Sequence, residues 1–233
     1  MKLKSLTAFF LCFNDAKTIA SLVKQAYKLL PAVSRDFEVM VVDDGSTDNS
    51  YKILQGLKTY YPRLKVIHHF QNQGYGAAII SGFKNASRDW VFYTDGDGQY
   101  DPSEIKLLVN KAAPGIDVVN GYKLKRQDNW LRRAAGQLYN QLLHFLYPLP
   151  IRDIDCDFRL IRKKFLRQIS FTSKSGAFPL ELILKLQKAG AKFAEVGIQH
   201  YPRRYGRSQF FRLPHLLKTL RDHLQFYWYW HYL

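Results

Sequence analysis

The sequence predicts an α/β fold with a mostly parallel sheet and helices on both of its faces. Short apolar runs typical of buried strands alternate with amphipathic stretches typical of helices through the first half of the chain. The 233 residues are 47% hydrophobic and 23% charged, which supports a packed core and excludes global disorder. Since no run of about 20 apolar residues occurs, an ordinary transmembrane helix is not expected.

The elements of the first half follow one another in a regular order. Apolar runs predict strands over residues 6–13, 37–42, 64–68, 90–94 and 118–119. Helical periodicity predicts helices over residues 15–30, from Ser46 or Asp48 to about Tyr60, over residues 75–86, and after Pro102. The first of these helices is expected to end before Pro31, because proline interrupts helical hydrogen bonding. Alternation of this kind is typical of parallel strands joined by crossover helices.

The second half of the chain is strongly basic. Lys and Arg outnumber Asp and Glu by 35 to 19 in the whole chain, and by 21 to 7 in residues 121–233, a net charge of +14 there. Such a surface favours phosphates, a membrane or nucleic acid as partners, with a merely solubilising surface as the alternative. Leu-rich helices are expected over residues 138–149 and 209–233, and the second ends in an aromatic run suited to a membrane interface.

Two acidic clusters follow two of the predicted strands. Val41-Val42 leads into Asp43-Asp44-Gly45-Ser46-Thr47-Asp48, and Phe92-Tyr93-Thr94 leads into Asp95-Gly96-Asp97-Gly98-Gln99. Ligands bind beyond the carboxyl ends of strands in sheets of this type. Carboxylates there suit Mg²⁺ or Mn²⁺, and such a metal usually also holds substrate phosphates. Ordinary turn chemistry is the alternative for either cluster alone.

Taken in order, these motifs resemble family 2 glycosyltransferases of the GT-A (Rossmann-like) fold. The resemblance rests on Asn14-Asp15, Val42 to Asp48, Asn72 to Ala78 and Asp95 to Gln99. The most similar subgroup is dolichol-phosphate mannose synthase with its bacterial polyprenyl-phosphate relatives. That subgroup has an Asp-x-x-Ser-Gly-Phe-Arg segment, which 153–159 resembles, and a basic Gly-x-Ser segment, which 203–208 resembles. The chain departs from the pattern at Leu11 to Asp15, where proline often precedes Tyr-Asn-Glu, and at Lys123, Cys156 and Asp157.

The resemblance implies an inverting, metal-dependent enzyme that moves a sugar from a UDP- or GDP-linked donor to a polyprenyl (dolichyl or undecaprenyl) phosphate. The expected metal ligands are Asp95, Asp97 and Gln99. The expected nucleotide-sugar contacts are Asn14, Asp15, Asp43, Asp44, Asn72, Gly74, Gly76, Asp95, Gly96, Lys123, Arg132 and Arg133. The expected acceptor-phosphate contacts are Arg203, Arg204, Arg207 and Ser208, and the expected catalytic residues are Asp97, Asp153 and Arg159. The glycines at 74 and 76 would let the backbone approach the nucleotide.

The acceptor decides whether a general base is needed. A lipid phosphate is already ionised near neutral pH, whereas a sugar hydroxyl must lose a proton, for which Asp153, Asp155 or Asp157 would be the candidate. Residues 1–208 are expected to form the catalytic domain and residues 209–233 a membrane-interface helix that could also pair two copies. Two isolated cysteines, Cys12 and Cys156, suit a reducing compartment, so we expect a cytoplasmic protein bound peripherally to the cytoplasmic membrane face.

Three other classes fit less well. Haloacid-dehalogenase-like phosphatases carry a similar acidic motif, but it follows their first strand, whereas three predicted strands precede Asp95. Receiver domains are about half as long as this chain. A non-enzymatic nucleic-acid-binding protein would suit the charge, yet no helix-turn-helix, RNA-recognition motif or zinc finger is present, so no nucleic acid is expected as a partner.

Overall fold

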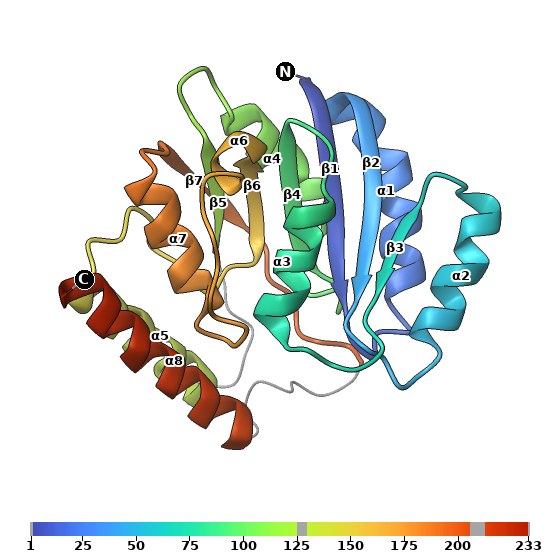
Figure 1. The fold of residues 1–233 in the computed structure, drawn as a ribbon. Helices are drawn as coiled ribbons and strands as arrows, with labels where there is room; N and C mark the ends of the chain where they lie inside the picture. The colour runs from blue at the N-terminus through green and yellow to red at the C-terminus, as the bar shows by residue number, and fades with distance from the viewer. Residues whose placement is uncertain (1, 125–129, 206–212, 233) are drawn as a thin grey trace.

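A computed structural model describes residues 2–124, 130–205 and 213–232 (Figure 1). Its described strands form one seven-stranded sheet in the order β3-β2-β1-β4-β6-β5-β7. The strands are β1 (Leu3–Cys12), β2 (Ser34–Asp43), β3 (Lys65–His68), β4 (Trp90–Asp95), β5 (Val118–Lys123), β6 (Phe158–Arg162) and β7 (Phe193–Ile198). Only β6 runs antiparallel to its neighbours, β4 and β5, so the predicted mostly parallel α/β sheet is confirmed.

Helices cover both faces of this sheet. The helices are α1 (Ile19–Val33), α2 (Ser50–Tyr60), α3 (Tyr75–Asn85), the 3₁₀ turn η1 (Pro102–Glu104), α4 (Ile105–Lys111), α5 (Trp130–Leu146), α6 (Lys163–Leu166), α7 (Phe178–Lys188) and α8 (Leu213–Tyr232). Apolar residues of α1, α2 and α4 pack on one face, and those of α3, α6 and α7 pack on the other. The central strand β1 serves both cores, because Phe10 and Cys12 face the first layer while Phe9 and Leu11 face the second.

The first helix differs from the sequence prediction at both ends. Residues 15–18 form a turn in which the amide of Thr18 donates to the Asp15 carbonyl, and the helix itself begins at Ile19. It then continues through Pro31 to Val33. Proline is tolerated there because it lies in the last turn, where the buried stripe extends to Val33 and the Ser34 amide closes the helix on Leu30.

The second half contains elements that the sequence did not predict. β6, α6, α7 and β7 all lie between residues 158 and 198, where no helix or strand was expected. Residues 158–162 show neither strict alternation nor one apolar run, because Arg159 and Arg162 interrupt it, and they become a strand by pairing with β4 and β5. The predicted helix over 138–149 is displaced, because α5 begins at Trp130 and ends at Leu146.

The last helix lies beside α5 (Figure 1). The Tyr139 hydroxyl on α5 lies 2.7 Å from Nε2 of His223 on α8, and Phe226 is buried against Leu143 and Tyr147. Among the helices of the described ranges, none is both long and apolar enough to cross a membrane.

Candidate active site

Strand register gathers the predicted acidic motifs at one edge of the sheet. Cys12 of β1 pairs with Asp43 of β2, Leu11 pairs with Asp95 of β4, and Asp43 pairs with His68 of β3. The ends of four strands therefore meet at the carboxyl edge, where parallel α/β sheets bind their ligands.

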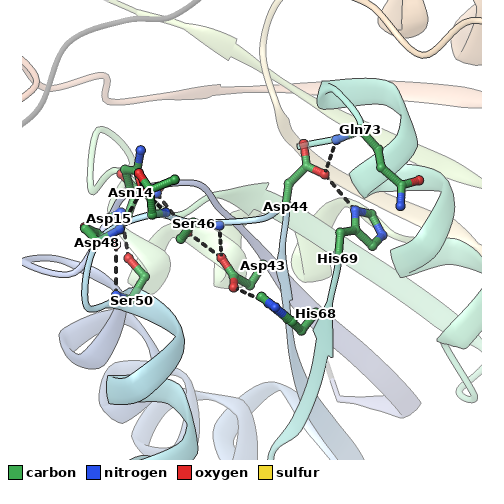
Figure 2. Close-up of polar contacts among 11 residues, drawn as sticks. Asn14, Asp15, Asp43, Asp44, Ser46, Asp48, Ser50, His68, His69 and Gln73 are labelled. Atoms are coloured by element: carbon green, nitrogen blue, oxygen red, sulfur yellow. Dashed lines mark hydrogen bonds and ion pairs between the residues drawn. The ribbon is translucent and has the colours of Figure 1, made fainter. Parts of the chain in front are cut away.

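Asp43 makes its contacts inside the protein (Figure 2). Its side chain is fully buried. Oδ1 accepts from the amide of Ser46, 3.3 Å away, and from the Ser46 hydroxyl, while Oδ2 lies 2.7 Å from Nδ1 of His68. The sequence placed Asp43 against the nucleoside, but these contacts make it a positioning residue for the β2–α2 turn and for His68.

Asp44 is also buried and holds the entry to α3 (Figure 2). Its oxygens accept from the amides of Gln73 at 2.9 Å and Gly74 at 3.0 Å, and Oδ1 lies 2.6 Å from Nδ1 of His69. A negative charge at the start of a helix also complements the helix dipole. Asp44 therefore fixes the loop before α3, and the nucleotide contact predicted from the sequence stays a prediction.

Asn14 and Asp15 join the β1–α1 loop to the β2–α2 turn. Asn14 adopts a left-handed backbone, with φ of 58°, and its side-chain oxygen accepts from the amides of Thr47 at 2.7 Å and Asp48 at 3.2 Å. Burial raises the pKa of Asp15 to about 6, with a further contribution from Asp97. Both residues line a cavity of about 280 Å³. The other residues that line this cavity are Ala16, Lys17, Thr18, Asp48, Asn49 and Tyr205.

The two glycines at the start of α3 let the backbone of residues 173–174 approach closely. Gly74 has φ of 101°, and a Cβ there would lie 2.6 Å from the carbonyl oxygen of Lys174. A Cβ on Gly76 would lie 2.8 Å from the carbonyl oxygen of Ser173. The close approach predicted from the sequence is real, but the backbone that approaches is that of residues 173–174. Asn72 is exposed at the start of this loop.

The second acidic motif lies where β4 ends. Asp97 is buried, its Oδ1 accepts from the Gln99 amide at 2.9 Å, and its Oδ2 pairs with the guanidinium of Arg203. The side-chain amide of Gln99 donates to the carbonyl of Tyr201, 3.0 Å away, so this side chain is already engaged within the protein. Gly96 is required because a Cβ there would lie 2.2 Å from the Leu11 carbonyl oxygen.

Asp95 and Asp97 fit a divalent cation as a pair. Burial raises the pKa of Asp95, and the neighbouring carboxylates of Asp157 and Asp97 raise it further. A cation would relieve this repulsion. Within the described part of the chain, no three His, Cys, Asp or Glu side chains are arranged to hold a metal. A metal here would therefore complete its shell with substrate phosphate and water, as Mg²⁺ commonly does.

Arg159 lies elsewhere than the sequence predicted. It is fully buried, and it donates from Nε to Asn120 at 2.5 Å, from Nη1 to the Tyr93 hydroxyl at 2.8 Å, and from Nη2 to the Ile154 carbonyl. Strand register sets Arg159 beside Tyr93 of β4 and Asn120 of β5, so its guanidinium is engaged inside the protein and has no exposed surface for an acceptor phosphate. Arg159 instead supports the segment before β6.

The structure describes only some of the other basic side chains that the sequence analysis singled out. Lys123 donates to the Asp155 carbonyl at 2.7 Å and lies 3.5 Å from Asp153, so the two predicted residues form an ion pair. Arg204 is exposed. Arg132 and Arg133 belong to α5, but their side chains lie outside the described part of the structure, as do Arg207 and Ser208 entirely.

Sequence reasoning missed two residues of this edge, His68 and His69, which contact Asp43 and Asp44 of the first acidic motif. Asp157, named from the sequence only as a candidate base, is buried beside Asp95. The position of His68 and His69 at a predicted strand end was the available signal. Asp157 became visible only when the antiparallel register of Thr94 with Phe158 placed it across from Asp95.

Comparisons with known proteins agree with this geometry. A family model described as Glycosyl transferase family 2 matches residues 8–170. Undecaprenyl-phosphate 4-deoxy-4-formamido-L-arabinose transferase of Edwardsiella ictaluri (strain 93-146) is 28% identical over 200 residues, which are 85% of this chain and 60% of that protein. The protein of the same description from Enterobacter sp. (strain 638) is 28% identical over 212 residues, 89% of this chain and 64% of its own length. The chain thus spans less than two thirds of these curated relatives.

Solved structures show the same fold. Glucosyl-3-phosphoglycerate synthase from Mycobacterium tuberculosis, in complex with Mn²⁺, uridine diphosphate and phosphoglyceric acid, superposes with a TM-score of 0.71 at 19% identity, covering 95% of this chain and 76% of that one. Its complex with Mn²⁺ and UDP-glucose gives a TM-score of 0.68 at 17% identity, covering 95% and 77%. The predicted GT-A fold is therefore confirmed.

Proposed function

Because the chain belongs to glycosyl transferase family 2, we propose that it transfers a sugar from a nucleotide-diphosphate donor to a polyprenyl phosphate. The observation that carries the proposal is the pair of acidic motifs brought together at the carboxyl edge of a GT-A sheet. The description of the curated relatives as undecaprenyl-phosphate transferases supports the lipid acceptor. The family resemblance adds inversion at the transferred carbon.

The proposed cofactor is Mg²⁺ or Mn²⁺, held by Asp95 and Asp97. Related solved structures contain Mn²⁺ or Mg²⁺ together with uridine diphosphate, which supports this choice. When bound, the metal offsets the negative charge of the leaving diphosphate. Gln99 is a weaker candidate ligand, because its side chain is engaged with Tyr201.

The chain's own residues supply positioning and charge. Arg203 already lies against Asp97, so its guanidinium is placed to hold phosphate oxygens once a cation takes over that carboxylate. Arg204 follows on the surface and extends the positive charge toward the acceptor. Since a lipid phosphate is ionised at neutral pH, transfer needs this orientation more than it needs a general base.

The pair of helices α5 and α8 is the proposed membrane contact. Both expose large apolar side chains, including Leu138, Leu142 and 86% of Phe145 on α5, and Leu217, Leu220, Leu224 and 61% of Trp228 on α8. Exposed Lys218 and Arg221 accompany them on α8. Aromatic and leucine side chains flanked by cations suit the interface of an anionic bilayer. We therefore place the protein peripherally at the cytoplasmic membrane face, with residues 209–233 as its interface element.

A donor screen tests the proposed reaction. Radiolabelled UDP- and GDP-sugars are offered with Mn²⁺ and a short-chain polyprenyl phosphate, and label in the organic phase is measured. We expect transfer from at least one donor, and loss of transfer when EDTA is added. Label that enters a soluble sugar acceptor, with none in the lipid, would contradict the lipid acceptor and make Asp153 the first residue to test as a base.

Liposome sedimentation tests the membrane contact. The full chain is expected to sediment with vesicles containing phosphatidylglycerol and to be partly released by high salt, because surface charge interactions are screened. The double variant Leu220→Asp with Leu224→Asp should bind these vesicles less while keeping its affinity for the donor nucleotide. Leu107→Asp is the matched control, because Leu107 is an exposed leucine on α4, away from α5 and α8. Equal sedimentation of all three proteins would contradict the proposal.

A further inference from the structure

Asp43 has little capacity left for a ligand. Its carboxylate is fully buried, Oδ1 accepts from the amide and hydroxyl of Ser46, and Oδ2 faces Nδ1 of His68 at 2.7 Å. Ser46 in turn accepts from the Asn14 amide at 2.9 Å, which ties this carboxylate to the loop after β1. Because the carboxylate has no exposed surface, a base N–H could reach its remaining lone pair only if neighbouring side chains moved.

His68 is the more exposed partner of the pair that it forms with Asp43 (Figure 2). It is the last residue of β3, directly opposite Asp43 in the strand register, and about a quarter of its side chain is exposed. One face of its ring stacks on Tyr51, with centroids 3.9 Å apart and planes at 24°, and Phe70 meets its edge at 6.0 Å. The ring is therefore oriented by its contact with Asp43 and by the stack on Tyr51, while Phe70 is exposed.

The contact with Asp43 also selects the tautomer of His68. Because a carboxylate oxygen accepts, Nδ1 carries the hydrogen, and Nε2 is a hydrogen-bond acceptor whenever the ring is neutral. Nε2 has no hydrogen-bond partner among the described residues. An oriented acceptor at the carboxyl edge of β3, beside the first acidic motif, is suited to a donor group on a bound ligand.

We infer that His68 recognises the base of the donor nucleotide, with Nε2 accepting from a ring N–H. This inference rests on the proposed function, since it assumes a nucleotide-diphosphate sugar at this edge. Uracil carries such a hydrogen on N3 and guanine on N1. Cytosine and adenine have an unprotonated ring nitrogen in the matching place, which would face Nε2 acceptor to acceptor. His68 therefore selects UDP- or GDP-linked donors over CDP- and ADP-linked ones, and Asp43 is its positioning residue.

The neighbouring histidine provides a comparison within the same chain. His69 contacts Asp44 through Nδ1 in the same manner, at 2.6 Å, but its Nε2 is already 2.9 Å from the Ser81 hydroxyl. It is also buried, with only 8% of its surface exposed. Both histidines thus contact an aspartate through Nδ1. They differ at Nε2, which is engaged with Ser81 in His69 and is available to a ligand in His68.

Titration calorimetry with UDP, GDP, CDP and ADP, each with Mn²⁺, tests the inference on the full chain. The four ligands share a diphosphate, so their affinity ratios report the base. We expect UDP or GDP to bind about tenfold more tightly than CDP and ADP, because the mismatched bases leave an acceptor unpaired. In His68→Phe, which keeps the ring stacked on Tyr51, this ratio should fall to about twofold or less. His69→Phe should keep the wild-type ratio, even if all four affinities drop together.

A methylated ligand provides a test that does not depend on how well a variant folds. UDP and GDP methylated on the ring nitrogen, at N3 and N1 respectively, should bind wild-type protein about tenfold more weakly than their parents. Equal binding of the methylated and parent nucleotides, or an unchanged base ratio in folded His68→Phe, would overturn the role of His68 while leaving the proposed reaction intact. Failure of the wild type to bind any of the four nucleotides would instead refute the proposed function.

Discussion

Replacing Asp44 with alanine separates a structural carboxylate from a ligand-binding one. From the sequence alone, a strand-end carboxylate in this motif is expected to serve the nucleotide, so its loss would weaken donor binding and leave stability unchanged. In the structure, Asp44 is buried and accepts from the amides of Gln73 and Gly74 and from Nδ1 of His69. Its removal leaves three donors without their partner.

The size of the effect follows from those three contacts. A buried donor left without its partner costs about 1–3 kcal/mol, and water can reach the exposed Gln73 amide, so the lower end applies. The free energy of unfolding should therefore fall by about 3 kcal/mol. For a chain of this length, each kcal/mol lowers Tm by about 2–4 °C, so Tm should fall by roughly 6–12 °C.

Thermal and urea denaturation of Asp44→Ala measure this change. Asp48→Ala is the matched control, because Asp48 also accepts two backbone amides, from Ser50 at 2.9 Å and Ala16 at 3.2 Å, but is exposed. The control should cost about 1 kcal/mol or less. If Asp44→Ala melted with the wild type while its affinity for the donor nucleotide collapsed, the carboxylate would belong to the ligand and our interpretation would be wrong.

Three further predictions concern the same edge. Asp97→Asn should lower the rate of sugar transfer at least about tenfold and weaken metal-dependent nucleotide binding, and near-normal turnover at saturating metal would remove Asp97 from the mechanism. Gly74→Ala should lower Tm, because its Cβ would lie 2.6 Å from the Lys174 carbonyl oxygen at a φ of 101°, whereas Gly115→Ala, with open space around it, tests the cost of positive φ alone. Burial raises the pKa of Asp15 to about 6, so the folded state holds this proton more tightly than the unfolded state. Metal-free wild type should therefore lose stability relative to Asp15→Asn as pH rises from 4 to 7, and parallel urea midpoints for the two proteins would contradict this.

In the first half of the chain, the local pattern of apolar and polar residues was enough to predict the fold. β1, β2, β4 and the helices of this half are long enough to show their period, and the short β3 shows as an apolar run. Each acidic motif directly follows a strand, so fold class and site edge follow from residues close together in the chain. The second half gave weaker signals. β6 has five residues and becomes a strand by pairing with β4 and β5, which no local period records.

The sequence by itself determined which side chains stand at the carboxyl edge, and the tertiary structure decided what each one contacts. Asp43 and Asp44 look alike in sequence whether they face a ligand or an internal donor, and only the register of β2 with β3 brings His68 beside Asp43. Arg203 reaches Asp97 across 106 residues of chain. Arg159 finds its buried partners because the register of β6 sets it beside Tyr93 of β4 and Asn120 of β5. A residue's type fixes the chemistry it can offer, whereas strand order and register fix its partner, and those depend on contacts between distant segments.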